Sequence, residues 1–258
     1  MRRLKNDKSG TYLYGIVSAC ERLSGASGVI EGVAGIDGST VHGISKAALM
    51  AVVSDVSNAG FRPTRRCLAA HHGILKHLMG KCVAVLPASC GNISDGPEPI
   101  LRMLSTKQAE LVDQLQRVSN KVEMGLRMRW DVPNIFGYFA TIHPELKSMS
   151  DEIYNGQEPS RGEKIELGRL FDHLLKGDRL AHTKTVVKVL SGRCFEVREN
   201  KVGDEREVMN LACLVGRDRH EDFEKALFEA ANLFDASFSF DFNGPWPPYN
   251  FVQTDARL

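Results

Sequence analysis

The chain has 258 residues, of which 33 are basic and 32 acidic, and hydrophobic residues make up 43% of it. These values are typical of a globular protein with one large or two modest domains. A net charge of +1 does not provide the basic surface of a nucleic-acid-binding protein, and no apolar run reaches the length of a membrane span. Polar residues follow Met1-Arg2-Arg3, so we predict no signal peptide and expect the chain in the cytoplasm.

The first half of the chain alternates between strand-like and helix-like patterns. Clusters of β-branched and aromatic residues predict strands at 12–17, 40–44, 49–53 and 83–86. Apolar residues at helical spacing predict helices at 65–81 and 98–119. Residues 121–131 alternate strictly, with one apolar face and one charged face, and predict a strand between core and water.

Residues 132–162 contain three prolines and a polar stretch, which favours a connector with a short helix at 144–154. The rest of the chain reads as one long helix or a helix pair at 165–190, with Gly177-Asp178 as the candidate break. Strands at 195–198 and 208–215 follow, then a helix capped by Asp218 and Glu221, and a strand from Phe238. The second half therefore has the order α-β-β-α-β.

These patterns predict an α+β fold with two domains. The first, residues 1–131, is a mixed α+β sheet with helices. Residues 132–162 form the connector. The second domain, residues 163–258, is built from the α-β-β-α-β elements and ends in a tail rich in proline and aromatic residues.

The tail starts with phenylalanines that alternate along a strand, and Asn243-Gly244 predicts a turn that ends it. Three prolines then stiffen the segment that carries Trp246, Tyr249 and Phe251. These three aromatic residues are candidates for binding a protein partner, because buried aromatic side chains contribute much interface energy. The alternative is packing over the chain's own domain. We expect Trp246 to be the anchor, and Tyr249 and Phe251 to make the partner contact.

Sites for chemistry are not evident in the sequence. The six cysteines form no CxxC pair, and His71, His72 and His77 lack the i, i+4 spacing of a zinc helix. His71 lies on the apolar stripe of its helix, so we expect it to be buried and hydrogen-bonded. We predict no metal, no cofactor and no catalytic residue, and hence no enzyme.

Four segments carry a resemblance to a known family: TYLYGIV at 11–17, LAAHHGILKHL at 68–78, VAVLPASCG at 83–91 and FNGPWPPYNF at 242–251. Together they resemble the gas vesicle protein GvpL/GvpF family over essentially the whole chain, and the GPWPPY element is the most specific of them. One position departs from the family pattern: Cys90 stands where an aromatic residue usually precedes the glycine.

The resemblance implies two α+β domains, the second of them ferredoxin-like. It also implies an accessory or minor structural protein of gas vesicle assembly, which binds the hydrophobic shell subunit, helps to nucleate or build the shell, and is found with the gas vesicle in the cytoplasm. The expected partners are the shell protein and other accessory proteins, with no nucleic acid and no membrane. The alternative is a small-molecule-binding or enzymatic α+β protein whose site the sequence does not identify.

Overall fold

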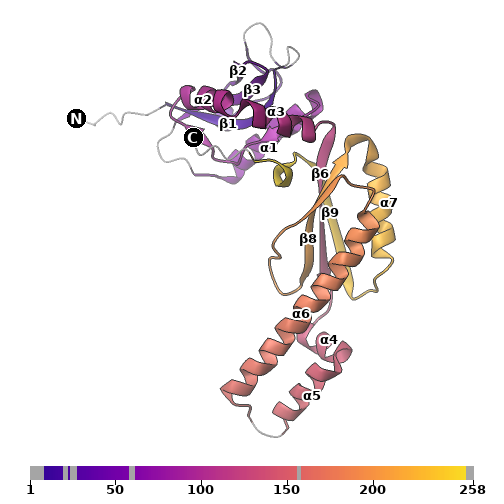
Figure 1. Cartoon of the computed structure of the whole chain (residues 1–258). Helices are drawn as coiled ribbons and strands as arrows, with labels where there is room; N and C mark the ends of the chain where they lie inside the picture. The colour runs from indigo at the N-terminus through magenta and orange to yellow at the C-terminus, as the bar shows by residue number, and fades with distance from the viewer. Residues whose placement is uncertain (1–8, 20–22, 24–27, 58–61, 156–157, 254–258) are drawn as a thin grey trace, which may run out of the picture. The chain divides into compact units, whose positions relative to one another are not determined.

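The computed structural model describes residues 9–19, 23, 28–57, 62–155 and 158–253 (Figure 1). The chain forms an α+β fold that divides into two compact units. The first unit consists of Met1–Glu123 together with Pro245–Leu258, and the second consists of Met124–Gly244. The divisions fall inside two strands, after Glu123 and after Gly244.

A sheet with strand order β2-β3-β1-β4 forms the centre of the first unit, and β5 pairs with β1 beside it. Its strands are β1 (Ser9–Ser18), β2 (Val41–Lys46), β3 (Leu49–Ser57), β4 (Leu86–Pro87) and β5 (Ile93–Ser94). The helices are α1 (Arg65–Lys81), α2 (Glu98–Thr106) and α3 (Gln108–Arg117), with short 3₁₀ turns η1 (Ile36–Gly38) and η3 (Tyr249–Phe251). The predicted helix at 98–119 is thus two helices, since Lys107 leaves the helical conformation.

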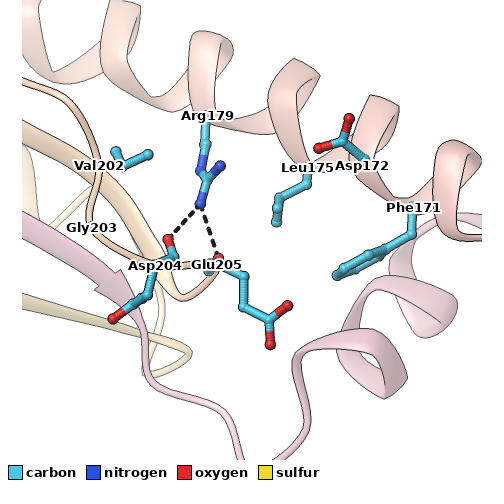
Figure 2. A pocket seen from close by; sticks show the side chains of 8 residues that line it. All are labelled: Phe171, Asp172, Leu175, Arg179, Val202, Gly203, Asp204 and Glu205. Atoms are coloured by element: carbon cyan, nitrogen blue, oxygen red, sulfur yellow. Dashed lines mark hydrogen bonds between the residues drawn. The ribbon is translucent and has the colours of Figure 1, made fainter.

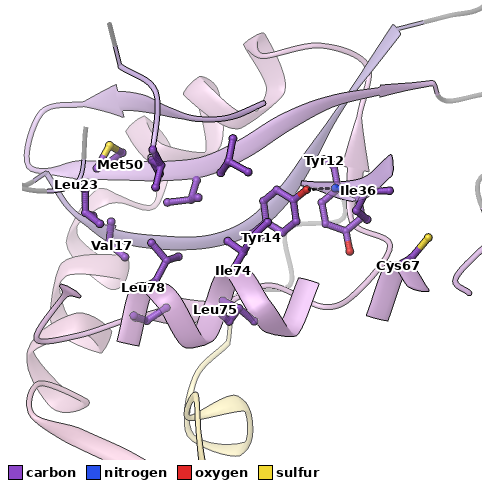
Figure 3. Close-up of a cluster of buried hydrophobic side chains, with 14 residues drawn as sticks. Tyr12, Tyr14, Val17, Leu23, Ile36, Met50, Cys67, Ile74, Leu75 and Leu78 are labelled. Atoms are coloured by element: carbon purple, nitrogen blue, oxygen red, sulfur yellow. Dashed lines mark hydrogen bonds between the residues drawn. The ribbon is translucent and has the colours of Figure 1, made fainter. Parts of the chain in front are cut away.

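The core of the first unit lies between α1 and the sheet (Figure 3). Thr64 begins α1 by accepting a hydrogen bond from the Cys67 amide, as an N-cap residue does. Ile74, Leu75 and Leu78 then point from α1 into the cluster that contains the β1 tyrosines (Figure 3). The predicted helix at 65–81 is confirmed. Of its expected apolar stripe, His71, Leu75 and Leu78 are buried, whereas Leu68 is 41% exposed.

Strand β1 is buried from Gly10 to Val17. Burial of both faces explains why its sequence has no alternation of apolar and charged residues. Its pairing with β3 shifts register between Leu13 and Gly15, so a bulge lies there. A Cβ at Gly15 would come within 2.8 Å of the carbonyl oxygen of Leu86 on β4. Glycine at this position allows β1 and β4 to approach each other.

The second unit contains a sheet of order β7-β8-β6-β9. Its strands are β6 (Lys121–Trp130), β7 (Glu196–Glu199), β8 (Glu207–Gly216) and β9 (Phe238–Trp246), and its helices are α4 (Ile135–Ile142), α5 (Pro144–Ile153), α6 (Arg161–Leu190), η2 (Arg217–Arg219) and α7 (His220–Ala231). Helices α6 and α7 pack on each other and on β8 (Figure 1). The chain order β-α-β-β-α-β with this strand order is that of the ferredoxin-like motif.

The compact units differ from the domain limits predicted from the sequence. The α-β-β-α-β reading of residues 163–258 lacked one strand, and β6, which the sequence assigned to the first domain, supplies it. Residues 132–162 are not a bare connector in the described part of the chain, because α4 and α5 belong to the second unit. The tail from Pro245, which the sequence placed in the second domain, belongs to the first unit.

Residues 161–190 form one long helix, α6, which continues through Gly177-Asp178 and so decides between the two alternatives for this segment. A capping box between Ser160 and Glu163 sets its start. Two other local predictions were wrong. Asp218 lies in the η2 turn and does not cap α7, whose N-cap residue Arg219 makes no side-chain cap bond. Asn243-Gly244 does not end the last strand, because β9 runs on to Trp246.

Candidate functional site

A buried histidine on α1 is the centre of a hydrogen-bond network in the first unit. His71 is fully buried, and its Nδ1 lies 2.9 Å from the hydroxyl oxygen of Tyr12 on β1. On the other side of the ring, Nε2 lies 3.1 Å from the carbonyl oxygen of Ala88 and 3.2 Å from the hydroxyl oxygen of Tyr249 in the tail. The expectation of a buried, hydrogen-bonded histidine is confirmed.

The partners of the ring determine where its proton lies. A carbonyl oxygen can only accept, so Nε2 carries the hydrogen that points to Ala88 and Tyr249. Nδ1 is then the acceptor for the hydroxyl group of Tyr12. Burial, with a smaller contribution from neighbouring His72, lowers the pKa of His71 to about 4. The imidazole is therefore neutral at pH 7.

The loop after β4 completes the network. The Gly91 amide donates to the Tyr12 hydroxyl oxygen over 3.0 Å, and Cys90 Sγ lies 3.3 Å from the same oxygen. Burial raises the pKa of Tyr12 far above the usual range, so its hydroxyl group keeps its proton. Cys90 thus contacts a phenol and not an imidazole nitrogen, and the network lacks the direct nucleophile–base contact of a catalytic cysteine.

The tail that supplies Tyr249 is held to the first unit by two side chains that no sequence motif had indicated. The Glu123 carboxylate accepts hydrogen bonds from the Asn250 amide at 2.8 Å and from Asn250 Nδ2 at 2.6 Å. Gln114 accepts from the amide of Gln253 at 2.7 Å and donates to its carbonyl oxygen at 3.2 Å. Glu123 is only 7% exposed, so the expectation of a fully solvated charged face on this strand was wrong.

The burial of the three tail aromatics differs from the order expected from the sequence. Phe251 is 1% exposed and is a core residue, so it cannot form the partner contact expected of it. Tyr249 packs against the core of the first unit and bonds to His71. Trp246, the expected anchor, is instead 41% exposed. The hydrogen bonds from Glu123 and Gln114 hold the end of the tail, at Asn250 and Gln253, and not its beginning at Trp246.

Trp246 lies beside an exposed part of α1. Its ring is 6.0 Å from that of His72, centroid to centroid, with the planes at 83°, which is an edge-to-face arrangement. The exposed side chain of Leu68 is one helical turn before His72, on the same face of α1. We call Leu68, His72 and Trp246 the aromatic surface.

All four sequence segments that carried the family resemblance meet at this site. Tyr12 comes from the first, His71 and His72 from the second, Ala88 to Gly91 from the third, and Trp246 and Tyr249 from the fourth. No group of three or more potential metal ligands occurs within the described ranges. The buried network thus lies directly beneath the part of α1 that His72 and Trp246 share at the surface of the first unit.

Comparison with known proteins shows the family of the chain. The model of the family described as "Gas vesicle synthesis protein GvpL/GvpF" matches residues 10–253. The chain belongs to the GvpL/GvpF family. Among its relatives is gas vesicle protein F of Streptomyces sp. (strain CB03234), which is 26% identical over 248 residues that cover 94% of this chain and 99% of the relative. Gas vesicle protein F2 of Halobacterium salinarum is 24% identical, with 95% and 93% covered.

Two solved structures of GvpF share the fold. The crystal structure of GvpF from Anabaena sp. PCC7120 superimposes with a TM-score of 0.80 at 22% identity and covers 95% of this chain and 98% of its own. GvpF from Microcystis aeruginosa gives a TM-score of 0.78 at 21% identity, with 95% and 99% covered.

Family membership associates the chain with gas vesicle synthesis. Among the helices that the structure describes, none has both the length and the apolar character needed to cross a bilayer.

Proposed function

We propose that this GvpL/GvpF protein binds the hydrophobic shell subunit of the gas vesicle through the aromatic surface, and that it thereby helps to nucleate or build the shell in the cytoplasm. The observation that carries the proposal is the position of Trp246. A tryptophan with 41% of its surface exposed stands on a tail segment that two side chains and a buried phenylalanine hold in place.

Such an arrangement suits an interface for energetic reasons. Tryptophan is enriched among the residues that contribute most to protein–protein binding. Its segment is fixed before any partner arrives, because Pro247 and Pro248 are buried and Asn250 is bonded to Glu123. Little conformational entropy is then lost on binding, which favours affinity.

The apolar area expected on the shell subunit is suited to binding the aromatic surface. A subunit that forms a gas-filled shell must expose apolar area before it assembles, and exposed apolar area promotes aggregation. A protein that covers this area with an apolar and aromatic surface would keep the subunit available for assembly. Other accessory proteins of the vesicle are the second class of partner that we propose, either for an assembly factor or for a minor component of the shell.

The proposal can be tested in cells. A strain that lacks this protein is complemented with the wild-type chain, with Trp246→Ala or with Phe242→Ala, a substitution of another aromatic residue that is also 41% exposed. We expect phase-bright, pressure-collapsible bodies with the wild-type chain and the Phe242 variant, and far fewer with Trp246→Ala at equal protein level. Normal vesicle formation by Trp246→Ala would argue against the aromatic surface.

A further inference from the structure

A pocket of about 430 Å³ lies in the second unit, between α6 and the loop that joins β7 to β8 (Figure 2). Its volume is within the range of ligand pockets in proteins. One face of α6 supplies Phe171, Asp172, Leu175 and Arg179, and the loop supplies Val202, Gly203, Asp204 and Glu205. The lining therefore combines an apolar floor with three carboxylates and a single guanidinium.

The guanidinium group of Arg179 donates hydrogen bonds to carbonyl oxygens in and next to the loop. Its Nη2 donates to the carbonyl oxygens of Asp204 at 2.8 Å and Glu205 at 3.1 Å (Figure 2). Its Nε donates to the carbonyl oxygen of Glu207 at 3.0 Å. The guanidinium carbon is also 5.8 Å from the centre of the Trp130 ring. Arg179 thus holds the loop in place through two of its three guanidinium nitrogens.

Three backbone amides in and next to the loop also donate hydrogen bonds within the protein. The Gly203 amide donates to the Glu207 carboxylate, and the amides of Arg206 and Glu207 donate to Asp204 Oδ1 at 2.9 and 3.0 Å. Among the lining residues, the Gly203 amide and two nitrogens of Arg179 are thus bonded within the protein, and the carboxylates of Asp172, Asp204 and Glu205 supply oxygen acceptors. A ligand that bonds to these acceptors must bring its own N–H groups.

The three carboxylates differ in how strongly they are held. Asp204 accepts from Arg129 at 2.9 Å. Asp172 pairs with Lys176 at 2.6 Å, but both side chains are exposed, and exposed pairs of this kind contribute little energy. Glu205 has no ion-pair partner in the part of the chain that the structure describes. Figure 2 shows its carboxylate extending toward the side of the pocket on which Phe171 lies.

We propose that this pocket binds a guanidinium or ammonium group carried on a short apolar stem. The cationic head bonds to the Glu205 carboxylate and reaches Asp172, and the stem lies along Leu175. The Phe171 ring, which packs against Phe136 and Phe139 of α4, offers its face to the cation. Arginine and lysine side chains of a partner protein have this chemistry, and so do free aliphatic guanidines and polyamines.

The test is a titration of the ¹⁵N-labelled full chain, followed by two-dimensional NMR. The probes are n-butylguanidinium and its neutral isostere n-butylurea. We expect n-butylguanidinium to shift the amide signals of Val202–Glu205 and of the α6 residues saturably, and n-butylurea to shift them little. Glu205→Gln should weaken the binding of n-butylguanidinium about threefold or more. The control Glu221→Gln, an exposed acid on α7, should leave it unchanged.

Absence of saturable shifts at these amides would overturn the proposal, and so would equal affinity for the two probes or an unchanged affinity in Glu205→Gln. The source of the cation is decided by the capped peptide acetyl-Ala-Arg-Ala-amide. Affinity of the peptide equal to or above that of n-butylguanidinium supports the side chain of a partner protein. Binding of n-butylguanidinium without the peptide supports a small free cation as the ligand. The result is independent of the aromatic surface, because all lining residues belong to the second unit.

Discussion

The hydroxyl oxygen of Tyr249 lies 3.2 Å from Nε2 of His71, although 178 positions separate the two residues in the chain. The contact joins the motif-bearing tail to the buried side of α1. It places Trp246, three residues earlier, against the exposed side of the same helix at His72. One tail segment thus both closes the core of the first unit and builds its aromatic surface.

Tyr249→Phe should lower the free energy of unfolding by about 1 kcal/mol, the usual net contribution of one hydrogen bond. The loss stays modest because Nε2 of His71 keeps its bond to the Ala88 carbonyl oxygen. Chemical denaturation measures it, with Tyr154→Phe as the control, since Tyr154 is 55% exposed. An equal effect of both substitutions would show that the Tyr249 hydroxyl group does not hold the tail.

Phe251→Ala should be far more damaging to stability than Trp246→Ala. Phe251 is buried, and truncation of a buried phenylalanine costs about 3–5 kcal/mol. Trp246 is partly exposed, so its loss should cost about 1 kcal/mol. Thermal unfolding of the two variants distinguishes them. A larger loss in Trp246→Ala would restore the role of anchor that the sequence suggested for it.

Stability should fall as the pH is lowered from 6.5 toward 4. The folded chain holds His71 with a pKa of about 4, below the ordinary value of 6.5, so the unfolded chain binds the proton more readily. The stability from neutral His71 is complete above pH 6.5 and is lost as the pH falls through that window, by about 3 kcal/mol in total. Burial lowers the pKa of His182 as well, which adds an effect of the same sign.

The assignment of this effect to His71 can be checked by following imidazole signals in NMR between pH 7.5 and 4. His71 should stay neutral until well below pH 6. A normal titration near pH 6.5 would show that its ring is not buried in the network.

The two compact units predict which fragments fold. Residues 121–244 contain β6, β7, β8 and all of β9 but its last two residues, whereas residues 163–258 lack the central strand β6. We expect cooperative unfolding of the first fragment, followed by circular dichroism, and no folded state for the second, because a missing central strand exposes both of its neighbours. Cooperative unfolding of residues 163–258 would favour the limits read from the sequence.

Local signals in the sequence located most helices and strands. The apolar stripe of residues 65–81 gave the limits of α1 because periodicity and the Thr64 cap agree. Helix α4 was missed because the three prolines of residues 132–162 and the polar stretch at 155–162 indicate a connector. What stabilises this helix is tertiary, since Phe136 and Phe139 pack on Phe171 of α6.

The site was predictable only in part. The sequence singled out the tail aromatics, and it indicated that His71 is buried. The sequence could not predict which of Trp246, Tyr249 and Phe251 is the most exposed. That depends on hydrogen bonds to Glu123 and Gln114, which lie more than 120 residues away in the chain. Glu123 alternates with apolar residues on its strand like any solvated charge, so nothing local distinguishes it.

The most direct test is the binding of purified shell subunit to the immobilised chain, with wild type, Trp246→Ala and Phe242→Ala compared at equal loading. Phe242 is a matched control because its side chain and that of Trp246 are both 41% exposed. We predict at least tenfold weaker capture by Trp246→Ala, on the order of 1.4 kcal/mol, with a melting temperature close to wild type and with full capture by Phe242→Ala. Wild-type capture by a folded Trp246→Ala protein would contradict a role of the aromatic surface in binding the shell subunit.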